Sequence, residues 1–77
     1  MQMELDIFYK KAALTIKHVR QIKGLTQEQL AEKAGISLDY LGKIEATINK
    51  PGLVGLIKII NALEISFKEF FAYFEDI

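Results

Sequence analysis

The chain has 77 residues, of which 51% are hydrophobic, and its ten lysines and arginines are balanced by ten aspartates and glutamates. A chain of this length forms at most one domain and buries only about 60% of its unfolded surface. Having no cysteine and one histidine excludes a disulfide framework, a thiolate metal site and a histidine-rich metal site. The absence of cysteine fits a reducing cytosol, and no apolar run is long enough to cross a bilayer, so we expect a cytoplasmic protein without membrane association.

The neutral total hides an uneven distribution of charge. Residues 7–58 carry nine Lys or Arg against four acids, a net +5, whereas residues 1–6 are net −2 and residues 59–77 are net −3. Zero net charge argues against non-specific affinity for nucleic acid. A basic middle between acidic ends can still present a basic face.

The first predicted helix runs from about Ile7 to Lys23, because apolar residues recur there at spacings of three and four. The residues of this stripe are Phe8, Ala12, Ile16, Val19 and Ile22. Gly24 ends the helix, since glycine readily takes the left-handed conformation that terminates helices.

The second and third predicted helices are short and follow closely. Thr26 and Gln29 have the spacing of a capping box, and Gly35 stops the helix that they open. Its inward residues are Leu30, Ala31 and Ala34. Ser37 caps the third helix, which buries Leu41 and Ile44 before a turn at residues 47–52.

Two further helices complete the chain. The fourth runs from Leu53 to Leu63. Ser66 and Glu69 form another capping box, which opens a last, aromatic helix at about residues 66–75. No stretch alternates with period two for long enough to be a strand. We therefore expect an all-α fold of five helices in a single domain, residues 1–77.

Residues 26–46 have the spacing of a helix-turn-helix. Two short helices are joined by a tight turn at Gly35, and Ile36 can fill the angle between them. The second helix of such a pair can enter the DNA major groove, although an ordinary helical hairpin has the same pattern. The pattern alone leaves both interpretations open.

The residue types of this segment are more informative than the spacing of its helices. The sequence "GLTQEQLAEKAGIS", together with the "KIE", "NKP" and "ALEIS" that follow it, resembles the Cro and lambda-repressor type of helix-turn-helix regulators, the Xre-like family. The resemblance covers roughly residues 16–71 and implies the five-helix lambda-repressor-like fold. Within that family the chain is most similar to the small controller proteins of restriction–modification systems.

The resemblance implies a role for each matching position. The base-reading side chains would be Ser37, Leu38, Asp39 and Lys43. The contacts to the DNA backbone would come from Gln27, Tyr40, Asn49 and Lys50, with Lys17 and Lys23 as further phosphate neighbours. Arg20 and Glu45 match a structural ion pair of the family.

The chain also departs from the family pattern. Members often carry arginine where this chain has Leu38, and a basic "Arg-Gly-Lys-Arg" where it has residues 46–49, "ATIN". The usual glycine is therefore replaced by Thr47, and phosphate-binding charges are missing. Leu38 can touch a thymine methyl and Asp39 can accept from a cytosine amine. Gly42, inside the third helix, has two open explanations: close approach to DNA, or close packing against a neighbouring helix.

The last helix carries more aromatic residues than one buried face can hold. We expect Phe70 and Phe67 to cover the core. An exposed remainder would form an interface. The predicted dimer surface contains Phe67, Phe71, Tyr73 and Phe74. A dimer through the last two helices would separate its recognition helices by about 34 Å, one turn of DNA.

These observations predict a homodimeric transcriptional regulator that binds double-stranded DNA at a two-fold operator, as a repressor or as an activator that contacts RNA polymerase. The alternative is an antitoxin-like or dimerising helical interaction module with weak or no DNA binding. No phosphate-binding glycine loop or nucleophile–base set is present, so we expect no enzyme activity, cofactor or metal.

Overall fold

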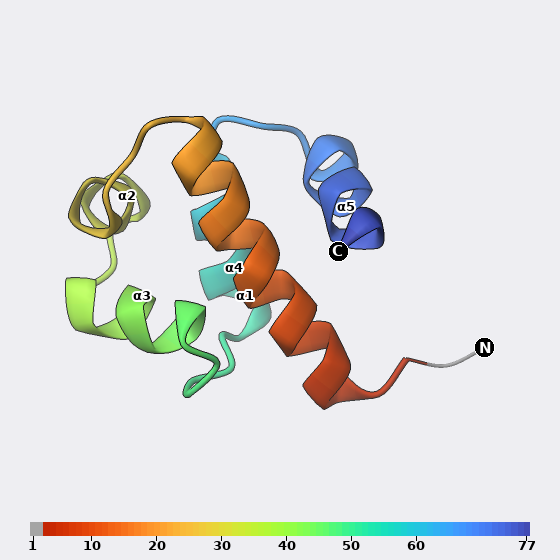
Figure 1. The fold of residues 1–77 in the computed structure, drawn as a ribbon. Coiled ribbons are helices and arrows are strands. Elements are labelled where there is room, and N and C mark those ends of the chain that lie inside the picture. Colours follow the sequence, from red (N-terminus) through yellow and green to blue (C-terminus); the bar gives the residue numbers. More distant parts are fainter. Residues whose placement is uncertain (1–2) are drawn as a thin grey trace.

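The structure is a computed structural model that describes residues 3–77, and within them the chain forms five helices and no strand. The helices are α1 (Leu5–Ile22), α2 (Gln27–Ala34), α3 (Leu38–Glu45), α4 (Leu53–Ala62) and α5 (Phe67–Asp76) (Figure 1). The predicted all-α class is confirmed. Each predicted helix is present with ends within two residues of those expected.

The N-terminal ends of three helices are fixed by hydroxyl side chains. Thr26 accepts a hydrogen bond from the Gln29 backbone N–H, and the Gln29 side chain accepts from the Thr26 N–H, so the first capping box is complete. Ser37 caps α3 by accepting one hydrogen bond from the Tyr40 backbone N–H at 3.0 Å. Ser66 accepts from the Glu69 N–H at 3.0 Å, but the described hydrogen bonds contain only this half of the second predicted box.

Each helix contributes at least one apolar side chain that is fully removed from solvent. These are Ile16, Leu30, Leu41, Ile59 and Phe70. Helix α1 packs against α3 and α5, while α2 packs against α3 and α4. In Figure 1, α2 and α3 lie on one side of α1, and α5 lies on the other. The core therefore holds the α2–α3 pair at one edge of the molecule and leaves its outer side free.

Three predictions about apolar side chains were wrong. Ile22 is 55% exposed. It is the last residue of α1, and the last buried residues of this helix are Val19 and Arg20. Phe67 is 48% exposed, whereas Phe74, expected on the outside, is 3% exposed. The Phe74 ring packs on Phe8 of α1, with centroids 5.1 Å apart, so α5 turns Phe74 and not Phe67 toward α1.

Across residues 3–77, none of the helices has the length and apolar character needed to cross a membrane.

Candidate nucleic-acid interface

The α2–α3 pair has the geometry that its sequence predicts. Gly35 takes the left-handed conformation, with φ at 68°, and the Ile36 N–H donates to the Ala31 carbonyl at 3.0 Å. The half-buried Ile36 side chain packs against the core. Two short helices are thus joined by a turn in which glycine supplies the reversal and isoleucine fixes the angle.

The outer face of α3 carries the predicted base-reading residues. Leu41 and Ile44 are buried, whereas the side chains of Leu38, Asp39 and Lys43 are exposed to solvent. The capping residue Ser37 is also exposed at the start of the helix. Lys43 Nζ lies 3.0 Å from Asp39 Oδ2, one helical turn away. The four residues therefore share one accessible surface, and their base-reading role stays a prediction.

The end of α3 has the hydrogen bonds of a Schellman motif, although it lacks glycine. The Thr47 N–H donates to the Ile44 carbonyl at 3.0 Å, and the Ile48 N–H donates to the Lys43 carbonyl at 2.8 Å. Thr47 takes the left-handed position with φ at 64°. A β-branched residue is strained there. The same Lys43 carbonyl accepts from the Asn49 N–H, so Asn49 is held directly after α3.

A buried polar network joins α1, α2 and α3. Arg20 Nε and Nη2 donate to the two carboxylate oxygens of Glu45 at 2.8 Å and 3.0 Å, and Arg20 Nη1 donates to the Leu25 carbonyl. The Glu45 side chain is only 3% exposed. Gln27 Nε2 donates to Glu45 Oε1 at 3.1 Å. The ion pair expected from the resemblance is present, and it also orients Gln27.

This network leaves Gln27 able to bind an anion. Its side-chain amide has two N–H donors, and Glu45 uses one of them. The other has no partner among the described hydrogen bonds and lies next to the positive end of α2, so its phosphate contact stays a prediction. A methyl group at Gly42 would lie 3.7 Å from Gln27 Oε1, an ordinary van der Waals contact. Packing within the fold therefore does not require glycine at position 42.

Two other predicted backbone contacts are engaged within the fold. The half-buried Tyr40 packs against the core, and its hydroxyl lies beside Gly55 of α4. Lys50 Nζ pairs with the Asp6 carboxylate of α1. This lysine holds the pKa of Asp6 below its usual value, through a hydrogen bond and through its charge. The partner of Lys50 could not be predicted from the sequence, because no local pattern connects two residues that are 44 positions apart.

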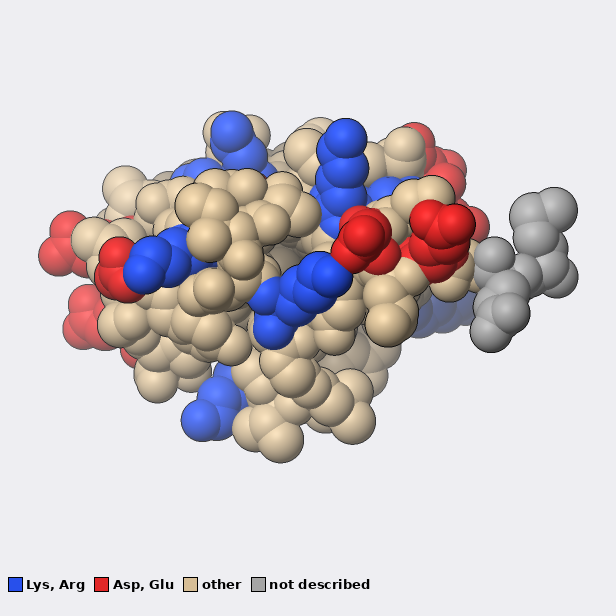
Figure 2. Space-filling model, turned by 90° about the horizontal axis from the view of Figure 1, so that it is seen from below, with Lys and Arg blue, Asp and Glu red and all other residues tan. Residues whose placement is uncertain are grey.

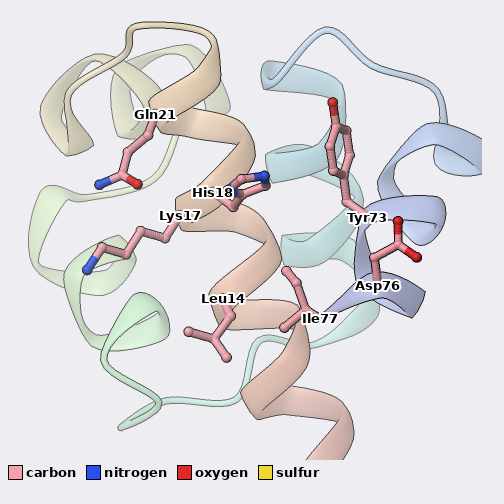
Figure 3. A pocket seen from close by; sticks show the side chains of 7 residues that line it. All are labelled: Leu14, Lys17, His18, Gln21, Tyr73, Asp76 and Ile77. Carbon is pink, nitrogen blue, oxygen red and sulfur yellow. The ribbon is translucent and has the colours of Figure 1, made fainter.

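Lys17 lies on α1 and Lys23 directly follows its last residue, so both are outside the α2–α3 pair. Lys17 lines an open hollow between α1 and α5, together with His18, Gln21 and Tyr73 (Figure 3). The His18 ring meets the Tyr73 ring edge-on, with centroids 5.5 Å apart. Lys23 Nζ donates to the Glu64 carbonyl at 3.4 Å, in the turn between α4 and α5. The DNA-backbone role of both lysines stays a prediction.

Charge on the candidate interface is mixed. Figure 2 views the molecule from the side where α3 and the turn after it lie in Figure 1, and basic side chains appear there singly, with acidic side chains against some of them. Lys43 and Lys50 each have a carboxylate partner. Phosphate attraction on this face therefore competes with attraction inside the chain.

A separate apolar groove runs between α4 and α5. Its lining consists of Leu53, Leu56, Ile57, Ile60, Phe67 and Phe71, and it encloses about 230 Å³. Of the four residues predicted for a dimer surface, only Phe67 and Phe71 meet here. Tyr73 lies in the hollow beside His18, and Phe74 is buried inside the protomer.

Comparisons with known proteins agree with this geometry. A helix-turn-helix family model matches residues 16–70. The chain is 38% identical over 56 residues to the HTH-type transcriptional regulator SutR of Escherichia coli K12, and 46% identical over 50 residues to the immunity repressor protein of Bacillus phage phi105. These matches cover 73% and 65% of the chain. The chain spans about a third of the length of either relative, 32% and 35%.

The structure is also similar to solved structures over nearly its whole length. The crystal structure of the restriction–modification controller protein C.Esp1396I superposes with a TM-score of 0.87 and 32% sequence identity, covering 90% of this chain and 91% of that chain. The same controller protein has been solved as a tetramer in complex with its natural 35 base-pair operator. The chain belongs to the helix-turn-helix family of DNA-binding transcriptional regulators.

Proposed function

We propose that this protein is a cytoplasmic transcriptional regulator that binds a two-fold DNA operator as a homodimer and has no catalytic activity. The observation that supports this most strongly is the accessible face of α3, where Leu38, Asp39 and Lys43 are exposed behind the cap at Ser37. A helix presented in this way fits a major groove about 12 Å wide.

The proposed complex divides its contacts between positioning and base reading. Gln27 would bind a phosphate through its free N–H, with Tyr40, Asn49 and Lys50 near the same backbone. Leu38 would contact a thymine methyl, Asp39 would accept from a cytosine amine, and Lys43 would donate to guanine. Lys43 and Asp39 would have to separate for this, because they pair in the free protein.

The α4–α5 groove supports a dimer. Leu53 is 74% exposed, Val54 67% and Phe67 48%, and all three lie on α4 or α5. Exposed apolar side chains of this size beside an apolar groove are typical of an interface. A two-fold contact through this groove would present two α3 helices to half-sites about 34 Å apart. We expect the dimer to matter for affinity, since Lys43 and Lys50 of each protomer both have carboxylate partners.

Titrating salt against the binding of labelled promoter fragments tests the proposal. A DNA reader loses affinity as salt rises, with a slope on logarithmic axes of about −0.9 per phosphate contacted. We expect one preferred fragment and a negative slope. Absence of binding to every fragment at low salt would refute the proposal.

Two substitutions separate base reading from backbone contact. We expect Lys43→Ala to reduce the preference for the operator over other DNA. Gln27→Ala should weaken binding to all DNA sequences alike. Thermal unfolding of both variants is the control, because Gln27 also bonds Glu45. If both variants keep their fold and change the affinity for all DNA sequences by an equal factor, the base-reading role of Lys43 is wrong.

A helical protein-interaction module is the second candidate function. The pairing of Lys43 and Lys50 with carboxylates favours it, since little free positive charge remains beside α3. Such a module would dimerise through the α4–α5 groove and show no salt-dependent binding to DNA. Measuring dimerisation and DNA binding on one sample therefore distinguishes the two candidates.

A further inference from the structure

The segment after α3 is tethered to the first turns of α1. The ammonium group of Lys50 pairs with the carboxylate of Asp6 and lies 5.9 Å from the centre of the Tyr9 ring. Asp6 and Tyr9 are three residues apart on α1, so they lie on neighbouring positions of one helix face. Helix α1 thus offers Lys50 both an anion and an aromatic ring.

This tether is exposed and can be exchanged. The Lys50 side chain is 52% exposed and the Asp6 side chain 82%. Because neither group is buried, a phosphate oxygen can replace the carboxylate oxygen at Lys50 without removing a charge from water. Carboxylate and phosphate oxygens are chemically similar acceptors for an ammonium group, so they compete for the same lysine.

We propose that Asp6 sets the DNA affinity of this protein by holding Lys50 in the free state. The inference rests on the proposed DNA-binding function. Asp6 competes with the DNA backbone for the Lys50 ammonium group, and this competition is the same for every sequence. Asp6 therefore lowers affinity for operator and unrelated DNA by one common factor, while base discrimination is left to α3.

Comparing Asp6→Asn with Glu4→Gln in the full chain tests this inference. Both changes remove one negative charge from the same end of the molecule, but the described ion pairs place only Asp6 on Lys50. We expect Asp6→Asn to tighten binding to operator and to unrelated DNA by an equal factor of roughly two to five, the range of an exposed ion pair. Glu4→Gln should have a smaller effect.

The variant Lys50→Ala tests whether the effect of Asp6→Asn depends on Lys50. In that background Asp6→Asn should have no more effect than Glu4→Gln. The inference is overturned if Asp6→Asn weakens binding, if it matches Glu4→Gln in the wild-type background, or if its gain persists without Lys50.

A measurement without DNA separates this inference from the proposed function. NMR titration of the Asp6 carboxyl in the free protein should give a pKa below the usual value, returning toward it in Lys50→Ala. A normal Asp6 pKa in a protein that binds DNA overturns the inference alone. A lowered pKa in a protein that binds no DNA, with or without Asp6→Asn, overturns the proposed function and the affinity role together.

Discussion

Arg20 of α1 and Glu45 of α3 face each other in a bidentate ion pair that is almost closed to solvent, with side-chain exposures of 11% and 3%. The pair joins the first helix to the end of the candidate recognition helix. Glu45 also accepts from Gln27, the candidate phosphate ligand at the start of α2. One carboxylate therefore fixes the relative positions of three helices.

Removing only one partner of this pair should be more damaging than removing both. We expect Arg20→Met to lower the free energy of unfolding by about 3–5 kcal/mol, because the Glu45 carboxylate stays buried without its cation. The double variant Arg20→Met/Glu45→Leu should be more stable than Arg20→Met. Urea denaturation measures the free energy of unfolding of both variants. A double variant less stable than Arg20→Met would contradict this prediction.

At Thr47 the residue type is unfavourable for the backbone conformation that it adopts. Its φ of 64° costs a β-branched residue roughly 1–2 kcal/mol. Glycine avoids this cost, but it loses more conformational entropy on folding, which offsets part of the gain. We expect Thr47→Gly to raise the free energy of unfolding by about 0.5–1 kcal/mol, measured by thermal or urea unfolding. Ala46→Gly is the matched control. Ala46 is right-handed, with φ at −83°, so glycine there should destabilise.

Gly42 can be tested through stability and DNA binding together. A methyl group at this position meets only the Gln27 side chain, at 3.7 Å, so Gly42→Ala should stabilise α3 by up to about 1 kcal/mol. A stable variant with weakened DNA binding would assign the glycine to close approach of DNA. Destabilisation would show instead that the helix packing needs the glycine.

Local chemistry explains how much of the fold was predictable. Thr26, Ser37 and Ser66 begin helices, and Gly24 and Gly35 end them, through hydrogen bonds that span only a few residues. Such signals are readable in sequence, and helix ends were accordingly placed within two residues.

Side-chain partners across the fold were less predictable, because they depend on how helices rotate against one another. In α5 every candidate for the core was aromatic, so hydrophobicity could not choose between Phe67 and Phe74. In the structure Phe74 is the buried one, and it contacts Phe8, which is 66 positions away in the sequence. The pairing of Lys50 with Asp6 likewise has no local signal. The Arg20–Glu45 pair was expected only through the family resemblance.

The rotation of α5 leads to the last prediction, on the dimer. Phe67 and Phe71 border the apolar α4–α5 groove, and Phe67 is 48% exposed in the protomer. Because a two-fold interface contains each residue twice, Phe67→Ser should raise the dimer dissociation constant at least about tenfold without unfolding the protomer. Sedimentation equilibrium measures this constant. DNA binding should weaken in parallel and depend more steeply on protein concentration.

Leu14→Ser is the matched control for that experiment. Leu14 is similarly exposed, at 46%, but it lines the hollow between α1 and α5 and not the α4–α5 groove. We expect this variant to dimerise and bind DNA as the wild type does. If Leu14→Ser dissociates the dimer and Phe67→Ser does not, the two-fold contact lies on the α1–α5 side, and the two α3 helices would be spaced differently on DNA.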